Sequence, residues 1–160
     1  MYTIRTDYRD ETVIEKSRFI CTLKKVSSET EAQDFIKVVK KEFWDATHNC
    51  SAYIIDELAQ RSSDDGEPSG TAGLPMLEVL RKNQLSGVAA VVTRYFGGIK
   101  LGAGGLVRAY TGSVSKAVQS CGLARKILMG TFALSADAAD AGKLLNIIYQ
   151  QQLFTVASVE

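Results

Sequence analysis

The sequence has no apolar run that approaches the roughly 20 residues of a transmembrane helix. Its first residues alternate polar and apolar side chains and lack the apolar core of a signal peptide. Histidine occurs once, at His48, which excludes a zinc site with two histidine ligands. Cys21, Cys50 and Cys121 are odd in number and set far apart among apolar residues, which predicts buried, reduced thiols. These features together predict a cytoplasmic protein with no membrane partner.

Acidic residues are absent between residues 79 and 136, a stretch that holds eight lysines and arginines. The net charge of the whole chain is only +1. Any affinity for nucleic acid therefore depends on this uneven placement of charge. With 160 residues and 46% hydrophobic content, the chain can bury a core and form one domain with a small appendage.

The acid-free stretch predicts a strand, a glycine-rich loop and a helix in succession. Residues 88–93 form an unbroken apolar run typical of a buried strand. Apolar residues recur at three- and four-residue spacing over 106–121, which predicts a helix that ends at Gly122. The loop between them, residues 97–105, leaves backbone N–H groups free at a helix N-terminus. Partial positive charge there favours a phosphate or carboxylate.

This glycine loop matches neither the dinucleotide fingerprint nor the GxxxxGK[ST] phosphate loop. Two interpretations stay open: a tight turn that lets the helix pack closely on the strand, or a site for an anion or a nucleic-acid backbone. The second interpretation uses the following residues: Arg94, Tyr95, Phe96, Gly97, Gly98, Lys100, Gly102, Gly104, Gly105 and Arg108.

Residues 61–73 are rich in glycine, proline, serine and aspartate, which predicts a loop. Asp64, Asp65 and Glu67 lie within it but lack the alternation of a calcium-binding loop. Two of them together with a phosphate can hold Mg²⁺. Alternatively, the acids cap the next helix and pair with basic residues of the glycine loop, and we favour this polar network. His48, at the start of a predicted strand (residues 48–55), is a catalytic candidate, although a backbone hydrogen bond is the commoner role.

The remaining elements follow from local patterns. Residues 11–26 are predicted to be extended, with a bend at Ser17. The capping-box spacing of Ser28 and Glu31 predicts the start of a helix, and Trp44 is predicted to anchor the end of its apolar face in the core. Pro75 suits the first turn of a short helix.

Beyond Gly122 the pattern predicts a strand at residues 127–134, a helix at 138–149 and a strand at 153–159. A βαβ unit of this size cannot bury both of its faces alone. It must pack on the first domain, pair with a second copy in a homo-oligomer, or belong to a longer domain.

Four segments resemble the IMPACT/YigZ family, the bacterial relatives of the IMPACT translation regulator. They are DDGEPSGTAG (residues 64–73), VVTRYFGGIKLGAGGLVRAY (residues 91–110), KSRF (residues 16–19) and HNCSAY (residues 48–53). The resemblance covers roughly residues 1–125. It implies that residues 1–125 form a two-layer α/β sandwich similar to the second domain of ribosomal protein S5.

The resemblance further implies that residues 126–160 begin a ferredoxin-like domain. Such a domain needs a βαββαβ order, so we expect a truncated chain with an exposed apolar surface or a free strand edge. For function the resemblance implies a link to translation. The eukaryotic IMPACT protein acts by binding the activator of a starvation-responsive kinase, and bacterial members have no settled biochemical role.

Three hypotheses for function remain. The first is a non-enzymatic protein that contacts RNA or translation-associated proteins through the glycine loop, with no cofactor. The second is a magnesium-dependent enzyme acting on a phosphate ester or nucleotide, in which the acidic residues hold the ion. The third is a pure protein-interaction module. We prefer binding to catalysis because no nucleophile–base pair or metal-ligand spacing stands out.

Overall fold

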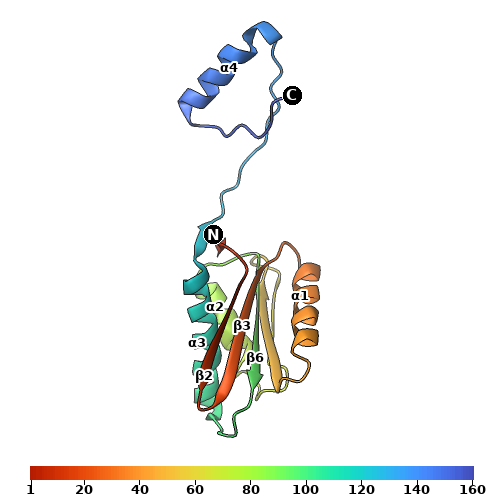
Figure 1. Cartoon of the computed structure of the whole chain (residues 1–160), viewed down its shortest axis with the longest axis vertical. Coiled ribbons are helices and arrows are strands. Elements are labelled where there is room, and N and C mark those ends of the chain that lie inside the picture. The colour runs from red at the N-terminus through yellow and green to blue at the C-terminus, as the bar shows by residue number, and fades with distance from the viewer. The chain divides into compact units, whose positions relative to one another are not determined.

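The structure is a computed structural model that describes residues 1–160. The chain forms two compact units, unit 1 (Met1–Ile127) and unit 2 (Leu128–Glu160). Figure 1 labels helices and strands of both units. In chain order the elements are β1 (Tyr2–Ile4), β2 (Tyr8–Ile14), β3 (Ser17–Lys25), α1 (Glu29–Glu42), β4 (His48–Ile54), β5 (Gln60–Ser63), α2 (Gly73–Lys82), β6 (Val88–Tyr95), α3 (Gly102–Cys121), β7 (Leu123–Arg125) and α4 (Ala138–Gln151). No helix is both long enough and apolar enough to cross a membrane.

Unit 1 is built on a five-stranded sheet with the order β2-β3-β6-β4-β5. Every neighbouring pair in it is antiparallel. The strand predicted at residues 88–93 is confirmed as β6, which lies at the centre and is buried from Val88 to Arg94. The short strands β1 and β7 pair with each other in a separate two-stranded ribbon.

Helices cover both faces of this sheet (Figure 1). α2 and α3 pack on one face through a core that includes Ala90 and Val92 of β6. α1 packs on the other face through a core that includes Ala89 and Val91. Because successive side chains of a strand point to opposite faces, this alternation separates the two cores. The mixed α/β class is confirmed, but the predicted two-layer arrangement is wrong: unit 1 has three layers, and the unbroken apolar run of β6 suits a strand covered on both faces.

The predicted start of α1 is confirmed, whereas the role predicted for Trp44 is wrong. Ser28 Oγ accepts a hydrogen bond from the Glu31 N–H at 3.1 Å. The Glu31 carboxylate reaches back to the N–H of Ser27 at 2.8 Å, one residue earlier than in a standard capping box. Trp44 is 81% exposed, because α1 ends at Glu42 and Phe43 makes the last contact with the core.

Two further expectations need correction near the edges of the sheet. The bend between β2 and β3 lies at Glu15 and Lys16, not at Ser17, and both residues have positive φ (46° and 64°), as in a two-residue hairpin turn. Residues 61–63 were predicted as loop but belong to β5, which pairs with β4. β5 has no apolar residue, so only its pairing with β4 and its cover by α2 make it a strand.

Unit 2 contains one regular element, α4, which confirms the predicted helix. The strands predicted at residues 127–134 and 153–159 are wrong, because no strand lies beside them to complete their backbone hydrogen bonds. No residue of α4 is buried.

Candidate functional site

The glycine loop (residues 97–105) follows β6 at one end of the sheet. The strand register places Arg94, near the end of β6, opposite Phe19 of β3 on one side and His48 of β4 on the other. The N–H of Gly97 donates to Ser17 Oγ at 3.2 Å, which attaches the loop to the start of β3. Segments far apart in the sequence therefore meet at this end of β6.

Arg94 and Glu67 form a buried ion pair at the same place. Arg94 Nη1 lies 2.7 Å from Glu67 Oε1, and the two side chains are only 6% and 3% exposed. Tyr110 of α3 donates its hydroxyl proton to the same carboxylate oxygen at 2.7 Å, and His48 Nε2 lies 3.6 Å from the other oxygen. Buried charges need this degree of pairing and hydrogen bonding to offset their lost hydration. Glu67 thereby joins the acidic loop (residues 64–73) to β6, β4 and α3.

This burial contradicts a direct phosphate contact for Arg94. Its Nη2 lies 3.3 Å from Ser17 Oγ, and its guanidinium carbon lies 5.4 Å and 5.5 Å from the ring centroids of Phe19 and Phe96. The Nε atom is buried and has no hydrogen-bond partner. Enclosed by these groups, Arg94 positions the start of the glycine loop and does not reach an external ligand.

Gly97 is the point of closest approach between the glycine loop and the β2–β3 turn. A Cβ atom on Gly97 would lie 2.1 Å from the carbonyl carbon and oxygen of Lys16, so only glycine fits there. The N–H of Phe96 donates to Thr47 Oγ1 at 3.0 Å, which fixes the adjacent residue. Gly98 and Gly102 have positive φ (89° and 70°) and need glycine for conformational reasons. The turn interpretation of these glycines therefore fits the geometry at the start of the loop.

Lys100 and Arg108 flank the first turn of α3. This helix begins at Gly102 with no side-chain cap and no acidic residue in its first turn. Arg108 Nη1 lies 3.3 Å from the position of a Cβ on Gly104, so its guanidinium lies over that turn. Both cations line a hollow of about 520 Å³, which Glu15 also lines.

Neither Lys100 nor Arg108 makes an ion pair in the structure. Lys16 is exposed in the turn that contacts Gly97 and is also without an ion pair. We call Lys16, Lys100 and Arg108 the loop cluster. An uncapped helix N-terminus beside unpaired cations is an environment that favours an anion. Gly104 and Gly105 lie within the first turn of α3 and keep side chains away from its N–H groups.

The two aromatic residues after Arg94 differ in availability. Tyr95 is half-buried, donates its hydroxyl proton to Asp45 at 2.8 Å, and has the Arg18 guanidinium 5.3 Å from its ring centroid. Phe96 is 47% exposed, with Arg94 against one face of its ring. Of the two rings, Phe96 is therefore the one that a ligand can reach.

The three carboxylates of the acidic loop have different partners. Asp64 accepts backbone hydrogen bonds from Gly70, Ala72 and Gly73 at 2.8–3.1 Å, in place of a cap for α2. Burial opposes ionisation of Asp64, but these three bonds outweigh it and lower the pKa of the carboxyl. Asp65 pairs with Lys40 of α1 at 2.6 Å.

Of these acids, only Glu67 faces the start of the glycine loop, through Arg94. The Asp65 carboxylate turns to the N–H of Asn49 in β4, at 2.7 Å. No three His, Cys, Asp or Glu side chains come together in the structure as a candidate metal-binding group. The arrangement fits the predicted polar network for Asp64 and Glu67, and it does not bring two carboxylates to one Mg²⁺ position.

His48 makes a hydrogen bond to the backbone. Its Nδ1 lies 2.8 Å from the carbonyl oxygen of Asp65. A carbonyl oxygen only accepts, so Nδ1 carries the proton of this bond. Its other nitrogen faces Glu67, and its ring lies 3.4 Å from the position of a Cβ on Gly66. His48 thus connects β4 to the acidic loop.

Sequence reasoning missed three members of the polar cluster around Glu67. Ser17 appeared only as a bend, Tyr110 only as part of the apolar face of α3, and Cys50 only as a buried thiol. The Cys50 thiol donates to the carbonyl oxygen of Asp64 at 2.9 Å, and burial raises its pKa to about 12. Burial also raises the pKa of Tyr110, which accordingly stays a hydroxyl donor. A tyrosine on a wholly apolar helix face was a usable signal, because a buried hydroxyl needs a partner.

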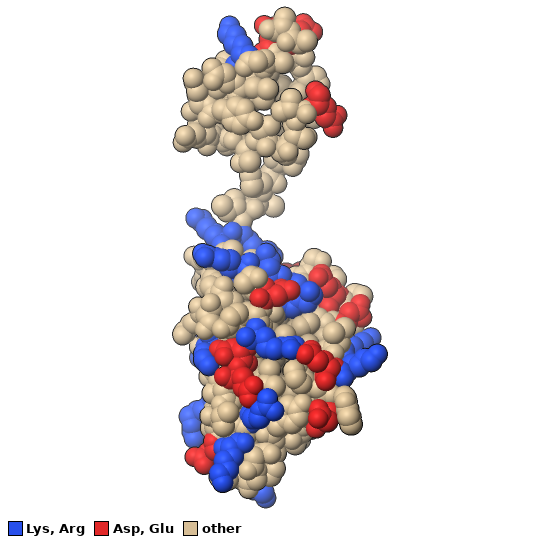
Figure 2. All heavy atoms as spheres, in the orientation of Figure 1, with Lys and Arg blue, Asp and Glu red and all other residues tan.

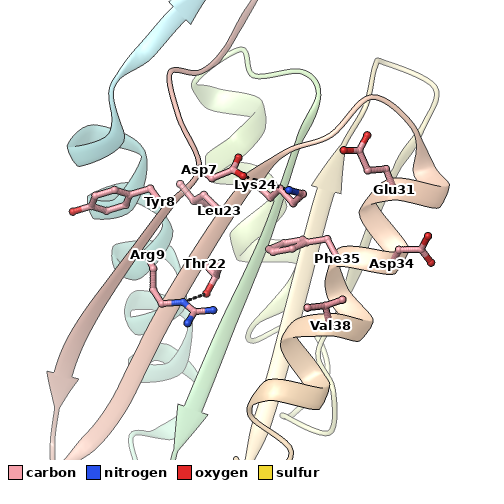
Figure 3. Close-up of a pocket in the computed structure, with 10 residues that line it drawn as sticks. All are labelled: Asp7, Tyr8, Arg9, Thr22, Leu23, Lys24, Glu31, Asp34, Phe35 and Val38. Carbon is pink, nitrogen blue, oxygen red and sulfur yellow. Dashed lines mark hydrogen bonds and ion pairs between the residues drawn. The ribbon is translucent and has the colours of Figure 1, made fainter.

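A larger hollow, about 670 Å³, lies elsewhere in unit 1, between α1 and strands β2 and β3 (Figure 3). Its lining includes the apolar side chains of Leu23, Phe35 and Val38. Arg9 lies in it with its Nε 3.0 Å from Thr22 Oγ1. None of the residues predicted from the sequence as functional lines this hollow, so the end of β6 remains the candidate site.

Comparisons with known proteins identify the family to which this chain is similar. Residues 15–118 match the family described as the Impact N-terminal domain. This range contains both the glycine loop and the acidic loop. The IMPACT family member YvyE of Bacillus subtilis is 56% identical over 153 residues, which cover 94% of this chain and 70% of that protein. The IMPACT family member YigZ of Escherichia coli is 39% identical over 152 residues, covering 86% of this chain and 74% of that protein.

A solved structure described as that of a hypothetical protein resembles this one with a TM-score of 0.76 and 35% sequence identity. The similarity covers 93% of this chain and 74% of that one. The family match, the sequence relatives and this structure agree, and the chain belongs to the IMPACT family.

Proposed function

We propose that this protein is a non-enzymatic regulator linked to translation that contacts RNA, alone or within the translation machinery, through the glycine loop. The observation that carries the proposal is the loop cluster beside the uncapped first turn of α3. Its cations make no ion pair, and no acidic residue stands in that turn. Unpaired cations and free backbone N–H groups are the groups that bind phosphates without regard to base sequence.

Each member of the site has a distinct role in this proposal. Lys100 and Arg108 neutralise phosphates, and the N–H groups of Gly104 and Gly105 hold a further phosphate oxygen. Phe96, exposed on one side, stacks on an unpaired base. Arg94 acts through the loop that it positions, not through contact with the RNA.

The link to translation rests on membership of the IMPACT family. From the same resemblance we infer that the sheet of unit 1 together with α2 and α3 has the fold of the second domain of ribosomal protein S5, to which α1 adds a third layer. Residues 126–160 would then contribute α4 to a ferredoxin-like domain. An experimental structure of unit 1 compared with ribosomal protein S5 tests the first inference. A different strand order or connection would refute it.

Exposed apolar residues around the glycine loop favour a second candidate, a module that binds another protein. Phe96, Ile99 and Val107 are 47%, 37% and 36% exposed. Aromatic and aliphatic side chains of this kind form the centre of protein interfaces. The magnesium-dependent alternative has no comparable support, because Asp64, Asp65 and Glu67 are each bonded to different partners.

The test is the binding of a fluorescent single-stranded RNA of about 20 nucleotides across a salt series. We compare the native protein with the double variant Lys100→Gln, Arg108→Gln. For single strands the slope of log K against log salt changes by about 0.7 for each phosphate contact, so we expect a flattening of about 1.4. The matched control is Lys37→Gln, Lys41→Gln, which removes the same charge from the exposed side of α1.

An unchanged slope in the loop variant would contradict the phosphate role of the glycine loop. Equal losses in the loop variant and the α1 control would show that only net charge matters. Absence of RNA binding by the native protein would refute the proposal and leave protein interaction as the remaining candidate.

A further inference from the structure

A second group of cations gathers at the opposite end of unit 1. Figure 2 shows lysine and arginine side chains crowded at the end where β1 and β7 lie. The group consists of Arg5, Lys25, Arg125 and Lys126, all exposed, which we call the ribbon cluster. None of the four makes an ion pair in the structure.

Backbone pairing brings these four residues together from three parts of the chain. The N–H of Arg5 donates to the carbonyl oxygen of Gly122 at 2.9 Å, which places Arg5 just before β7, three residues along the ribbon from Arg125. Lys126 Nζ lies 3.2 Å from Ser86 Oγ. These contacts hold the cluster in a defined arrangement on a folded surface.

Lys25 joins the cluster through its place at the end of β3. It pairs with Val88 at the start of β6, and the adjacent N–H of Val26 donates to the carbonyl oxygen of Gly87 at 2.9 Å. Lys126 Nζ lies 3.0 Å from the position of a Cβ on Gly87, and Gly87 pairs with Val26, the residue that follows Lys25.

The acidic residues near the ribbon cluster are already engaged. Asp7 accepts from the N–H of Lys25 at 2.9 Å and pairs with Lys24 at 3.3 Å. Asp56, which follows the Ile55 carbonyl that Gly87 contacts, accepts from two N–H groups of its own turn at 2.8 Å. The positive potential of the cluster is therefore only partly offset.

An aromatic ring lies among these cations. Tyr2 of β1 is directly opposite Arg125 of β7 in the ribbon, and it is 36% exposed. Directly opposed residues of antiparallel strands have Cβ atoms about 5 Å apart, so the side chains of Tyr2 and Arg125 leave the ribbon side by side. An aromatic ring beside cations is the combination that proteins use to hold single-stranded nucleic acid, through stacking and phosphate contacts.

The two basic clusters lie at opposite ends of β6. Val88 marks one end of this eight-residue strand and Tyr95 the other, a distance of about 23 Å at roughly 3.3 Å per residue. A flexible polyanion can follow the surface from one cluster to the other.

We propose that the ribbon cluster is a second phosphate-binding surface, so that a single RNA strand spans unit 1 from the glycine loop to β7. The proposal rests on the RNA-binding function given above for its partner, but on different residues. Arg5, Lys25, Arg125 and Lys126 contact phosphates, and Tyr2 stacks on a base. RNA that reaches both clusters gains the contacts of each.

The test uses the full chain and the salt series described above. The ribbon variant is Arg125→Gln, Lys126→Gln, and the control is again Lys37→Gln, Lys41→Gln. With RNA of about 20 nucleotides, we expect the ribbon variant to flatten the salt slope by about 1.4 and the α1 control to leave it unchanged. Thermal unfolding midpoints confirm that the variants are folded.

Each outcome separates this inference from the proposed function. A flattened slope in the ribbon variant supports phosphate contacts at the ribbon cluster, even where the loop variant binds like the native protein. A strand that spans both clusters requires a flattened slope in both variants. A native slope in the ribbon variant overturns the second surface, even where the loop variant loses affinity. Binding of phosphatidylglycerol vesicles in place of RNA, lost in the ribbon variant, also overturns it.

Discussion

Replacement of Glu67 by glutamine should destabilise unit 1 strongly. The substitution keeps the size of the side chain and a carbonyl oxygen for Tyr110, but it leaves the 6%-exposed Arg94 cation without its counter-charge. Breaking one partner of a buried ion pair costs about 3–5 kcal/mol. For a unit of this size that loss corresponds to a fall in the unfolding midpoint of about 10–20 °C.

Thermal and urea unfolding of Glu67→Gln, Arg94→Gln and the double variant measure this loss and the coupling between the two residues. The double variant removes both charges, so we expect it to be more stable than Glu67→Gln. The control is Glu11→Gln, which breaks the exposed pair with Arg18 and should leave the midpoint unchanged. If Glu67→Gln were as stable as the control, the buried pair could not be what holds the acidic loop to β6.

Three further outcomes follow from single contacts. Asp64→Ala should cost about 1–2 kcal/mol at pH 7 in urea unfolding. Burial opposes ionisation of Asp64, but backbone hydrogen bonds lower its pKa overall, so its stabilisation is complete above the unfolded value of about 3.9 and declines as the pH falls through the lowered pKa. An equal cost at pH 3 and pH 7 would contradict this. Gly97→Ala should destabilise the protein, because its Cβ would lie 2.1 Å from the Lys16 carbonyl. As a control, Gly112→Ala places a Cβ with no atom within 4 Å and should stabilise α3 by up to about 1 kcal/mol. An unchanged unfolding midpoint for Gly97→Ala would argue against the close contact. Iodoacetamide at pH 8 should label Cys50 slowly in the native protein and rapidly in urea, because burial raises the pKa of this thiol to about 12. Mass spectrometry measures the labelling, and fast labelling of native Cys50 would refute its burial.

Elements whose signals are local could be predicted from the sequence. Ser28 caps α1, and Gly122, with a φ of 74°, ends α3 as expected. The spacing of apolar residues located α3 and α4, and the apolar run located β6. These features depend on residues within about four positions of each other, so the sequence displays them directly.

The role of Arg94 could not be decided in the same way. An arginine next to a glycine loop suits a phosphate contact as well as a buried ion pair. The alternation of β6 puts Arg94 on the same face as Ala90 and Val92, beneath α2 and α3, and that face decides its burial. Its partner Glu67 lies 27 residues away, in a loop without periodicity. The prediction that Trp44 anchors the core was wrong for a different reason, because the direction of a large apolar side chain just past a helix end is not fixed by the helix.

The sequence by itself determined the helices, the central strand, the reduced cysteines expected at three separate positions and the membership of the IMPACT family, since each depends on composition, short-range spacing or extended motifs. Only the tertiary structure decided which charged side chains form ion pairs or hydrogen bonds within the fold and which remain without an ion pair at the surface. Arg94 and Glu67 pair with each other across distant segments, and Asp64 accepts hydrogen bonds from the backbone of its own loop, whereas Lys100 and Arg108 make no ion pair. Charge balance at a surface depends on strand register and helix packing, and these are set by contacts between residues far apart in the chain.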